Sequence, residues 1–236
     1  MLARRLAQLY GGLVLYGISA SFILLAGLGA DPWDVLHQGL ARRTGIGTGI
    51  WVCIVGALVL LLWIPLRQRP GFGTLSNVVV IGLVMEAILT AFQPADDLAV
   101  RAVLLGSGVA LNGVAIGLYI GAHFGPGPRD GLMTGLAARG HSIRVVRTGI
   151  ELTVLAAGAA LGGTVGVGTV LYALAIGPLA HIFVPMFALS EAEPLRARRA
   201  RPAHAAAGGV AEAARVAEAA VPRRGDPHGR LRDEAA

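Results

Sequence analysis

Six stretches of the chain are almost continuously apolar and long enough to form membrane helices. They cover about residues 8–28, 48–66, 74–93, 98–122, 145–163 and 168–190. A bilayer core about 30 Å thick needs roughly 20 apolar residues in a helix. The strands of a membrane barrel would instead show short segments of alternating polarity. The pattern therefore predicts an all-α, polytopic membrane protein with six transmembrane helices.

The composition supports this interpretation and bears on how the net positive charge of the chain is interpreted. Hydrophobic residues make up 55% of the chain and charged residues 14%, whereas an average soluble domain carries about 25% charged residues. The formal net charge is nevertheless +6, and the chain has arginine but no lysine. A basic chain can indicate nucleic-acid binding, but these arginines are spread over the loops. We therefore expect no nucleic-acid partner.

The arginines between the apolar stretches predict the orientation in the membrane, because cytoplasmic loops carry an excess of basic residues. If the N-terminus is cytoplasmic, eight arginines before residue 190 lie inside and three lie outside. The eight are Arg4, Arg5, Arg67, Arg69, Arg129, Arg139, Arg144 and Arg147, and the three are Arg42, Arg43 and Arg101. Six crossings then return the C-terminus to the cytoplasm.

The first apolar stretch has an alternative interpretation as a signal peptide. It follows Arg4 and Arg5, and the small residues Gly29 and Ala30 precede Asp31 as at a cleavage site. The stretch is longer than the usual signal-peptide core, however, and it has a counterpart later in the chain. A retained span is therefore the favoured interpretation.

The chain contains an internal repeat. Residues 29–43 (GADPWDVLHQGLARR) match residues 125–139 (GPGPRDGLMTGLAAR) at eight of fifteen positions, at an offset of 96. The segment GFGT at 71–74 recurs as GVGT at 166–169, at an offset of 95. Each half holds three spans, so the second half enters the membrane from the opposite side. The result is an inverted repeat, as in many secondary transporters.

The repeat and the composition divide the chain into three parts. Residues 1–93 form the first three-helix repeat and residues 94–190 form the second. Residues 191–236 are rich in Ala, Arg, Glu and Pro and have no aromatic residue. Such a segment cannot bury enough apolar surface to offset its ordering entropy. We expect it to be a disordered cytoplasmic tail.

The paired motifs resemble a known family. The P-W-D-V-L segment, the G-x-G-T turn and their recurrence as G-P-R-D-G-L and G-V-G-T are similar to the YczE-type bacterial integral membrane proteins, the YczE/YyaS group. The resemblance covers about residues 8–190. The second motif also has a weaker likeness to the G-G-T-D segment of YitT-type membrane proteins. The resemblance implies a multi-pass protein of the bacterial plasma membrane and implies no particular substrate.

The two P-x-D segments are typical of helix starts. Pro32 and Pro128 suit the first helical position, where no amide hydrogen is needed. Asp34 and Asp130 then fall in the first turn, where a carboxylate complements the free amides and the helix dipole. Each segment is too polar for a span and predicts a short interfacial or re-entrant helix. Helix capping is the favoured role for the two aspartates, and lining a substrate or ion path is the alternative.

The two G-x-G-T segments are expected to begin the third and sixth spans as structural turns. Their glycines allow close backbone packing, and their threonines suit N-caps. The residues are Gly71, Gly73, Thr74, Gly166, Gly168 and Thr169.

Ionisable side chains inside apolar spans are costly and commonly mark functional sites. Glu86 lies in the third span, and its repeat equivalent is His181 in the sixth. The repeat would place this carboxylate and imidazole at matching depths, where they could share a proton; a buried structural pair is the alternative. Glu151 lies in the fifth span, four residues after Arg147, so that an intrahelical ion pair is expected.

The sequence contains no recognisable catalytic or nucleotide-binding motif and no metal-ligand spacing. We therefore expect no enzyme activity, no cofactor and no metal. The favoured hypothesis is a small secondary transporter or exporter of an unknown small solute. The alternative is a non-transporting membrane scaffold or regulatory partner of another protein. The expected partners are the lipid bilayer and the solute, and the sequence leaves homo-oligomerisation open.

Overall fold

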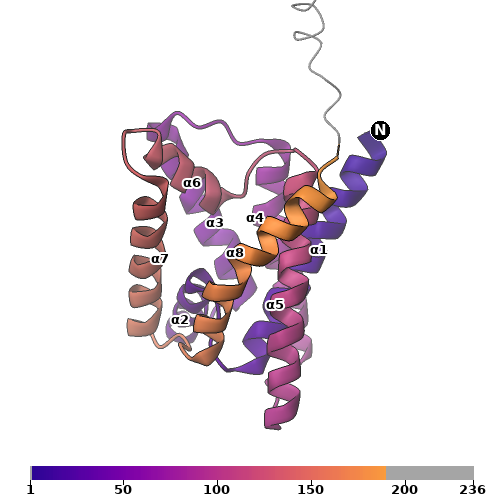
Figure 1. Cartoon of the computed structure of the whole chain (residues 1–236). Coiled ribbons are helices and arrows are strands. Elements are labelled where there is room, and N and C mark those ends of the chain that lie inside the picture. Colours follow the sequence, from indigo (N-terminus) through magenta and orange to yellow (C-terminus); the bar gives the residue numbers. More distant parts are fainter. Residues whose placement is uncertain (1, 190–236) are drawn as a thin grey trace, which may run out of the picture. The chain divides into compact units, whose positions relative to one another are not determined.

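Eight helices make up the part of the chain described by the computed structural model, residues 2–189 (Figure 1). Their bounds are α1 Leu2–Ala26, α2 Pro32–Thr44, α3 Thr48–Leu66, α4 Phe72–Ala91, α5 Leu98–Gly121, α6 Pro128–Ala137, α7 Ile143–Ala160 and α8 Val167–Phe187. The predicted all-α class is therefore confirmed. The expected tail, residues 191–236, lies outside the described residues.

Five of the helices, namely α1, α3, α4, α5 and α8, are long and apolar enough to cross a membrane. Their outward faces carry large apolar side chains such as Leu61, Ile64 and Leu174. The remaining expected span corresponds to α7, which has 18 residues. α7 differs from the other five helices because it carries three charged residues, Arg144, Arg147 and Glu151. The structure thus shows five candidate spans where the sequence pattern predicted six.

The centre of the molecule is the contact between α1 and α5, which run side by side (Figure 1). Gly12 of α1 lies against Leu118 and Tyr119 of α5, and Gly108 of α5 lies against Ser19 and Ile23 of α1. The missing side chains let the two helices approach closely, as in many membrane helix pairs. The start of α1 is also tied to α8, because Gln8 Nε2 donates to the carbonyl of Phe187 at 2.7 Å.

The packing of the two halves is reciprocal. α4 packs on α1, as α8 packs on α5. The short helix α2 of the first half packs on α7 of the second half, and the short helix α6 packs on α3. Each half therefore contributes its short helix to the other, so the described part folds as one body.

The two G-x-G-T turns make matching contacts with the loops before the short helices. Gly73 N donates to Phe124 O at 2.9 Å, and Gly168 N donates to Leu28 O at 2.8 Å. The expected role of the threonines as N-caps is wrong. Helices α4 and α8 each begin three residues before the start that an N-cap threonine would give, and their N-caps are Gly71 and Gly166. Thr74 and Thr169 lie in the first turn, and each hydroxyl accepts a hydrogen bond from the N-cap glycine, at 3.2 and 3.3 Å.

Gly29 and Gly125 lie at these reciprocal contacts. Both have positive φ angles, 106° and 113°. A Cβ on Gly29 would lie 2.7 Å from Thr169 Oγ1, and one on Gly125 would lie 2.9 Å from Thr74 Oγ1. Neither the backbone conformation nor the space therefore suits another residue.

We expect Gly29→Ala and Gly125→Ala each to lower the free energy of unfolding by about 1–3 kcal/mol, the usual cost of a strained backbone position. An unfolding titration in mixed detergent and SDS micelles measures this. Gly106→Ala is the control, because no atom lies within 4 Å of its added Cβ. Equal stability of the three variants would contradict the assignment of a tight, reciprocal contact.

Candidate solute-binding cavity

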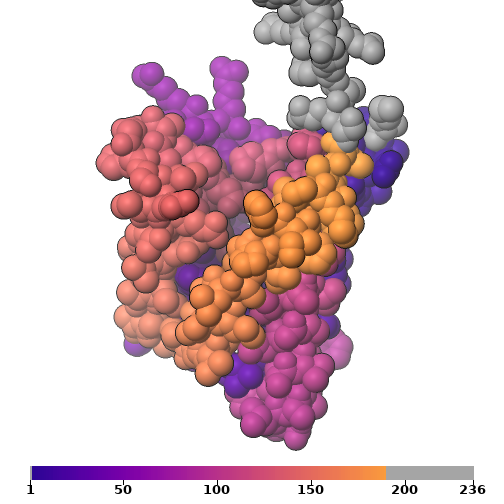
Figure 2. All heavy atoms as spheres, viewed as in Figure 1, coloured from indigo at the N-terminus to yellow at the C-terminus, as the bar shows by residue number. Residues whose placement is uncertain are grey.

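A cavity of about 510 Å³ lies where the two halves meet, and residues of all eight helices line it. Most of its wall is aliphatic, from residues such as Val55, Ile81 and Ile176. Its polar groups gather near the starts of α2 and α6. Figure 2 shows a hollow between α7 and α8, two helices that make few contacts with each other. The cavity is thus large enough for a small solute and reaches that gap.

The first polar group is the cap of α2. Asp31 is the N-cap, and its Oδ1 accepts hydrogen bonds from the amides of Trp33 at 2.8 Å and Asp34 at 3.0 Å. These amides have no partner inside the helix, so a carboxylate is a favourable cap. The equivalent N-cap of α6 is Gly127, which has no side chain. Of the two short helices, α2 therefore has a capping carboxylate and α6 has none.

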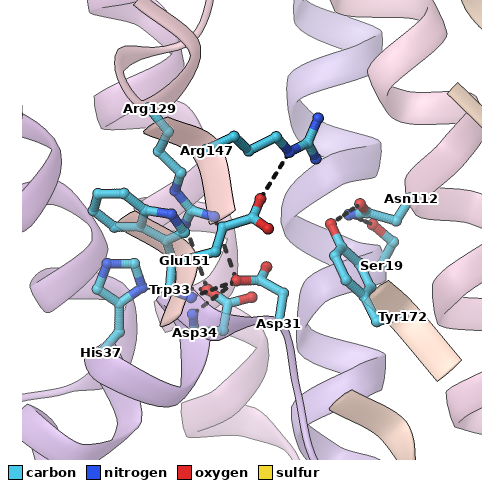
Figure 3. A network of polar contacts seen from close by, with 10 residues as sticks. All are labelled: Ser19, Asp31, Trp33, Asp34, His37, Asn112, Arg129, Arg147, Glu151 and Tyr172. Carbon is cyan, nitrogen blue, oxygen red and sulfur yellow. Dashed lines mark hydrogen bonds and ion pairs between the residues drawn. The ribbon is translucent and has the colours of Figure 1, made fainter. Parts of the chain in front are cut away.

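Arg129 of α6 joins this cap from the other half of the chain (Figure 3). Its guanidinium lies 3.4 Å from Asp31 Oδ1 and 3.7 Å from Asp34 Oδ1. It also stacks on the ring of Trp33, 5.1 Å from the ring centroid. We call Asp31, Trp33, Asp34 and Arg129 the central cluster. One cation thus serves two buried carboxyl groups across the boundary between the halves.

Asp34 of the central cluster makes one more buried contact. It is with the neighbouring His37, whose Nδ1 lies 3.2 Å from Asp34 Oδ1. Burial lowers the pKa of His37 to about 3, so that the imidazole is neutral and donates a hydrogen bond rather than forming an ion pair. Burial, together with the neighbouring Asp34, raises the pKa of Asp31 to about 6. The pKa of Asp34 is raised by burial as well. Protons therefore compete with Arg129 for these carboxylates.

Further polar groups line the cavity beyond the cluster. Tyr119 of α5 donates to Asp130 Oδ2 at 3.0 Å. Tyr172 of α8 donates to Asn112 Oδ1 at 3.0 Å, and Asn112 donates to Ser19 at 2.9 Å (Figure 3). These bonds connect α1, α5, α6 and α8 around the cavity and hold their polar groups in place.

Some of the residues singled out in the sequence gather at this cavity. Asp130, Glu151, Arg147 and His181 line it. The expected ion pair of Arg147 with Glu151 is present at 2.9 Å. Asp34 lies behind the cavity wall, where it contacts Arg129 and His37, and it does not take the capping role expected for it.

Glu86 is not among the residues that line the cavity, and its carboxylate has other partners. Its carboxylate accepts hydrogen bonds from the amides of Gly49 at 2.9 Å and Ile50 at 3.3 Å, which begin α3. The structure gives no hydrogen bond between Glu86 and His181, although both residues belong to its described part. Glu86 is therefore a cap that connects α4 to α3.

Sequence reasoning singled out Asp34 of the central cluster but missed the contact of Trp33 with Arg129. Trp33 and Arg129 stand between the proline and the aspartate of the two P-x-D segments, at equivalent positions of the repeat. These two equivalent residues contact each other in the structure, so their shared position in the sequence repeat was a usable signal. The charge of Arg129 had been counted only as an orientation signal.

The helices and cavity define the chain as a polytopic helical membrane protein. The chain belongs to a family of unknown function (DUF6198), whose model matches residues 3–185. An uncharacterized protein of Haemophilus influenzae is 41% identical over 177 residues, which cover 75% of this chain and 81% of that protein. No solved structure matches the chain significantly.

Two Bacillus subtilis proteins are also similar. The uncharacterized membrane protein YczE is 32% identical over 179 residues, 75% of this chain and 83% of that protein. The uncharacterized protein YyaS is 26% identical over 185 residues, 75% of this chain and 91% of that protein. These relatives confirm the resemblance to the YczE/YyaS group.

Replacement of Arg129 by Gln should destabilise the protein at pH 7.5 by about 2–3 kcal/mol. Removing one partner of a buried ion pair leaves an uncompensated charge, and the Arg129 side chain is only 26% exposed. The loss should shrink at pH 5, because the pKa of Asp31 is raised and the carboxyl groups take up protons instead.

The unfolding titration of the preceding section, repeated at both pH values, measures this effect. Arg69→Gln is the control, since Arg69 is exposed on the loop between α3 and α4. A destabilisation that is equal at both pH values would refute the electrostatic explanation.

Proposed function

We propose that this protein is a small secondary transporter or exporter of a small solute and not an enzyme. The observation that carries the proposal is the cavity of about 510 Å³ at the meeting point of both halves, with the central cluster at its polar end. Charged residues inside a membrane protein face such cavities and commonly mark substrate or ion paths. Transporter sites lie at the boundary between repeats, near the starts of short helices.

The proposal includes an inverted repeat of six crossings. The reciprocal helix contacts and the two matching G-x-G-T contacts are what a pseudo-twofold axis would produce. The start of α1 and the end of α8 lie together, since Gln8 contacts Phe187. The two ends of the described chain lie on the same side of the membrane only if the number of crossings is even. We therefore count α7 as a sixth span beside the five long apolar helices. Its charged residues, Arg147 and Glu151, are tolerated because they face the cavity.

Lipid and orientation follow from the same proposal. The exposed apolar faces of α3, α4 and α8 suit contact with lipid tails in the bacterial plasma membrane. Both termini would lie in the cytoplasm, as the arginine distribution predicts. The hollow between α7 and α8 would then be the solute's entrance, or the side on which the cavity opens in this conformation.

The two halves differ in a way that suggests how access alternates. In the first half, hydrogen bonds from the start of α3 to the Glu86 carboxylate hold α4 against α3. In the second half, the equivalent helices α7 and α8 hardly touch, and His181, the equivalent of Glu86, lines the cavity. Exchange of these two arrangements would open the cavity between α3 and α4 and close it between α7 and α8.

Gly177→Phe should abolish solute flux without unfolding the protein. Gly177 lines the cavity, and no atom lies within 4 Å of a Cβ built on it. The ring would therefore fill the cavity rather than displace a helix. Gly106→Phe is the matched control, because Gly106 has the same free space but does not line the cavity.

Proteoliposomes on a solid-supported membrane measure this with a panel of amines, amino acids, carboxylates and sugars. The proposal expects at least one protein-dependent current or pH change that Gly177→Phe removes and Gly106→Phe retains. No protein-dependent signal across the panel would count against transport. That outcome would favour the scaffold hypothesis. The segment that would then bind a partner protein, residues 191–236, lies outside the described residues.

A further inference from the structure

The charges around the cavity favour a cation over an anion. Three carboxyl groups and two guanidinium groups line it: Asp31, Asp130, Glu151, Arg129 and Arg147. Asp34 adds a fourth carboxyl group directly behind the wall, and it shares Arg129 with Asp31. The uncapped start of α6 would otherwise attract an anion, but Asp130 already places a carboxylate there. An entering cation would therefore improve the charge balance.

The two carboxyl groups of the central cluster share one cation, since the Arg129 guanidinium lies 3.4 Å from Asp31 Oδ1 and 3.7 Å from Asp34 Oδ1. Two buried carboxylates beside a single cation leave one negative charge unbalanced. Burial and the neighbouring Asp34 raise the pKa of Asp31 to about 6, so that below this pH the pair holds a proton. With this proton the cluster is neutral, since one carboxylate balances Arg129. If a singly charged cation enters and the proton leaves, two carboxylates balance two cations. The exchange of one proton for one cation thus conserves the charge of the cluster.

Trp33 provides a second, independent sign of a missing ligand. Its side chain is 94% buried, it lines the cavity, and its Nε1 has no hydrogen-bond partner among the described residues. Figure 3 shows the indole nitrogen on the side of the ring turned toward Arg129. A buried donor without a partner is costly. The surrounding side chains cover this nitrogen in the present conformation, and a ligand acceptor that reached it would remove the cost.

We propose that the cavity binds a small organic cation that carries a hydrogen-bond acceptor near its ammonium group, and that a proton leaves the carboxyl pair of Asp31 and Asp34 in exchange. The ammonium group contacts Asp31, the acceptor atom contacts Trp33 Nε1, and the aliphatic wall holds the hydrocarbon part. This identification of the ligand rests on the proposed transport function for its biological meaning, but the binding itself does not depend on transport.

The surroundings of the carboxyl pair agree with this exchange. Tyr16 of α1 and Tyr172 of α8 line the same cavity, and the Tyr172 hydroxyl donates to Asn112. Arg129 of α6 is its fixed cation, and His37 on α2 is neutral. The carboxyl pair is therefore the group in the cluster that exchanges a proton. Apparent affinity for the cation should rise with pH up to the point at which the pair is deprotonated.

Three compounds that differ in one group test the proposal: phenylethanolamine, which is an ammonium ion, neutral 1-phenylethanol, and the anion mandelate. Calorimetry on the purified full chain at pH 6 measures binding in two buffers of different ionisation enthalpy. We expect phenylethanolamine to bind at least tenfold more tightly than either analogue, with release of about one proton.

Variants assign the binding to the central cluster. Asp31→Asn, which retains a good helix cap, should weaken phenylethanolamine binding at least tenfold and abolish proton release. Trp33→Phe should weaken binding about three- to tenfold, the value of one hydrogen bond, with proton release retained. Asp96→Asn on the exposed loop before α5 is the control and should change neither.

The proposal is overturned if mandelate binds as tightly as phenylethanolamine, if no compound binds, or if binding releases no proton. Binding that survives Asp31→Asn unchanged would also overturn it. Flux assays separate this inference from the transport proposal. Cation binding without any flux would refute transport alone, whereas flux of solutes that do not compete with phenylethanolamine would refute the ligand assignment alone.

Discussion

The ion pairing of Arg129 with Asp31 and Asp34 is the interaction on which the rest of the structure depends. It joins the start of α6 to the start of α2, and so connects the second half of the chain to the first. Charged groups at membrane depth are stable only when they are paired or face water. The pairing therefore restricts both short helices to positions from which their first turns meet beside the cavity. The cavity exists because eight helices surround this meeting point.

Much of the fold was accessible from the sequence because its causes are local. The apolar stretches predicted the long helices, and the prolines predicted where α2 and α6 begin. The repeat marked the two G-x-G-T segments as equivalent structural turns, and Gly73 and Gly168 of these turns make matching contacts. α7 was harder to classify, because its charged residues count against a span unless they face a cavity. That fact depends on the packing of α7 and is absent from its own sequence.

The site was less predictable because it depends on contacts between distant segments. Glu86 stood out in the sequence as an ionisable group in an apolar helix, but the sequence could not show that the free amides of α3 would use its carboxylate. Likewise, Asp31 and Arg129 are 98 residues apart and pair only after both halves have folded. The repeat nevertheless contained the necessary information, since it placed Trp33 and Arg129 at equivalent positions.

The difference between Trp33 and Arg129 shows why two unlike halves are needed. Two arginines at these adjoining positions would repel each other, and two tryptophans would leave the carboxyl groups of Asp31 and Asp34 without a cation. One of each gives a stacked cation and ring, 5.1 Å apart at the centroid. The first half supplies the carboxylates and the second supplies the charge that balances them. Neither half could form the central cluster alone, so selection on this cluster would keep the repeat within a single chain.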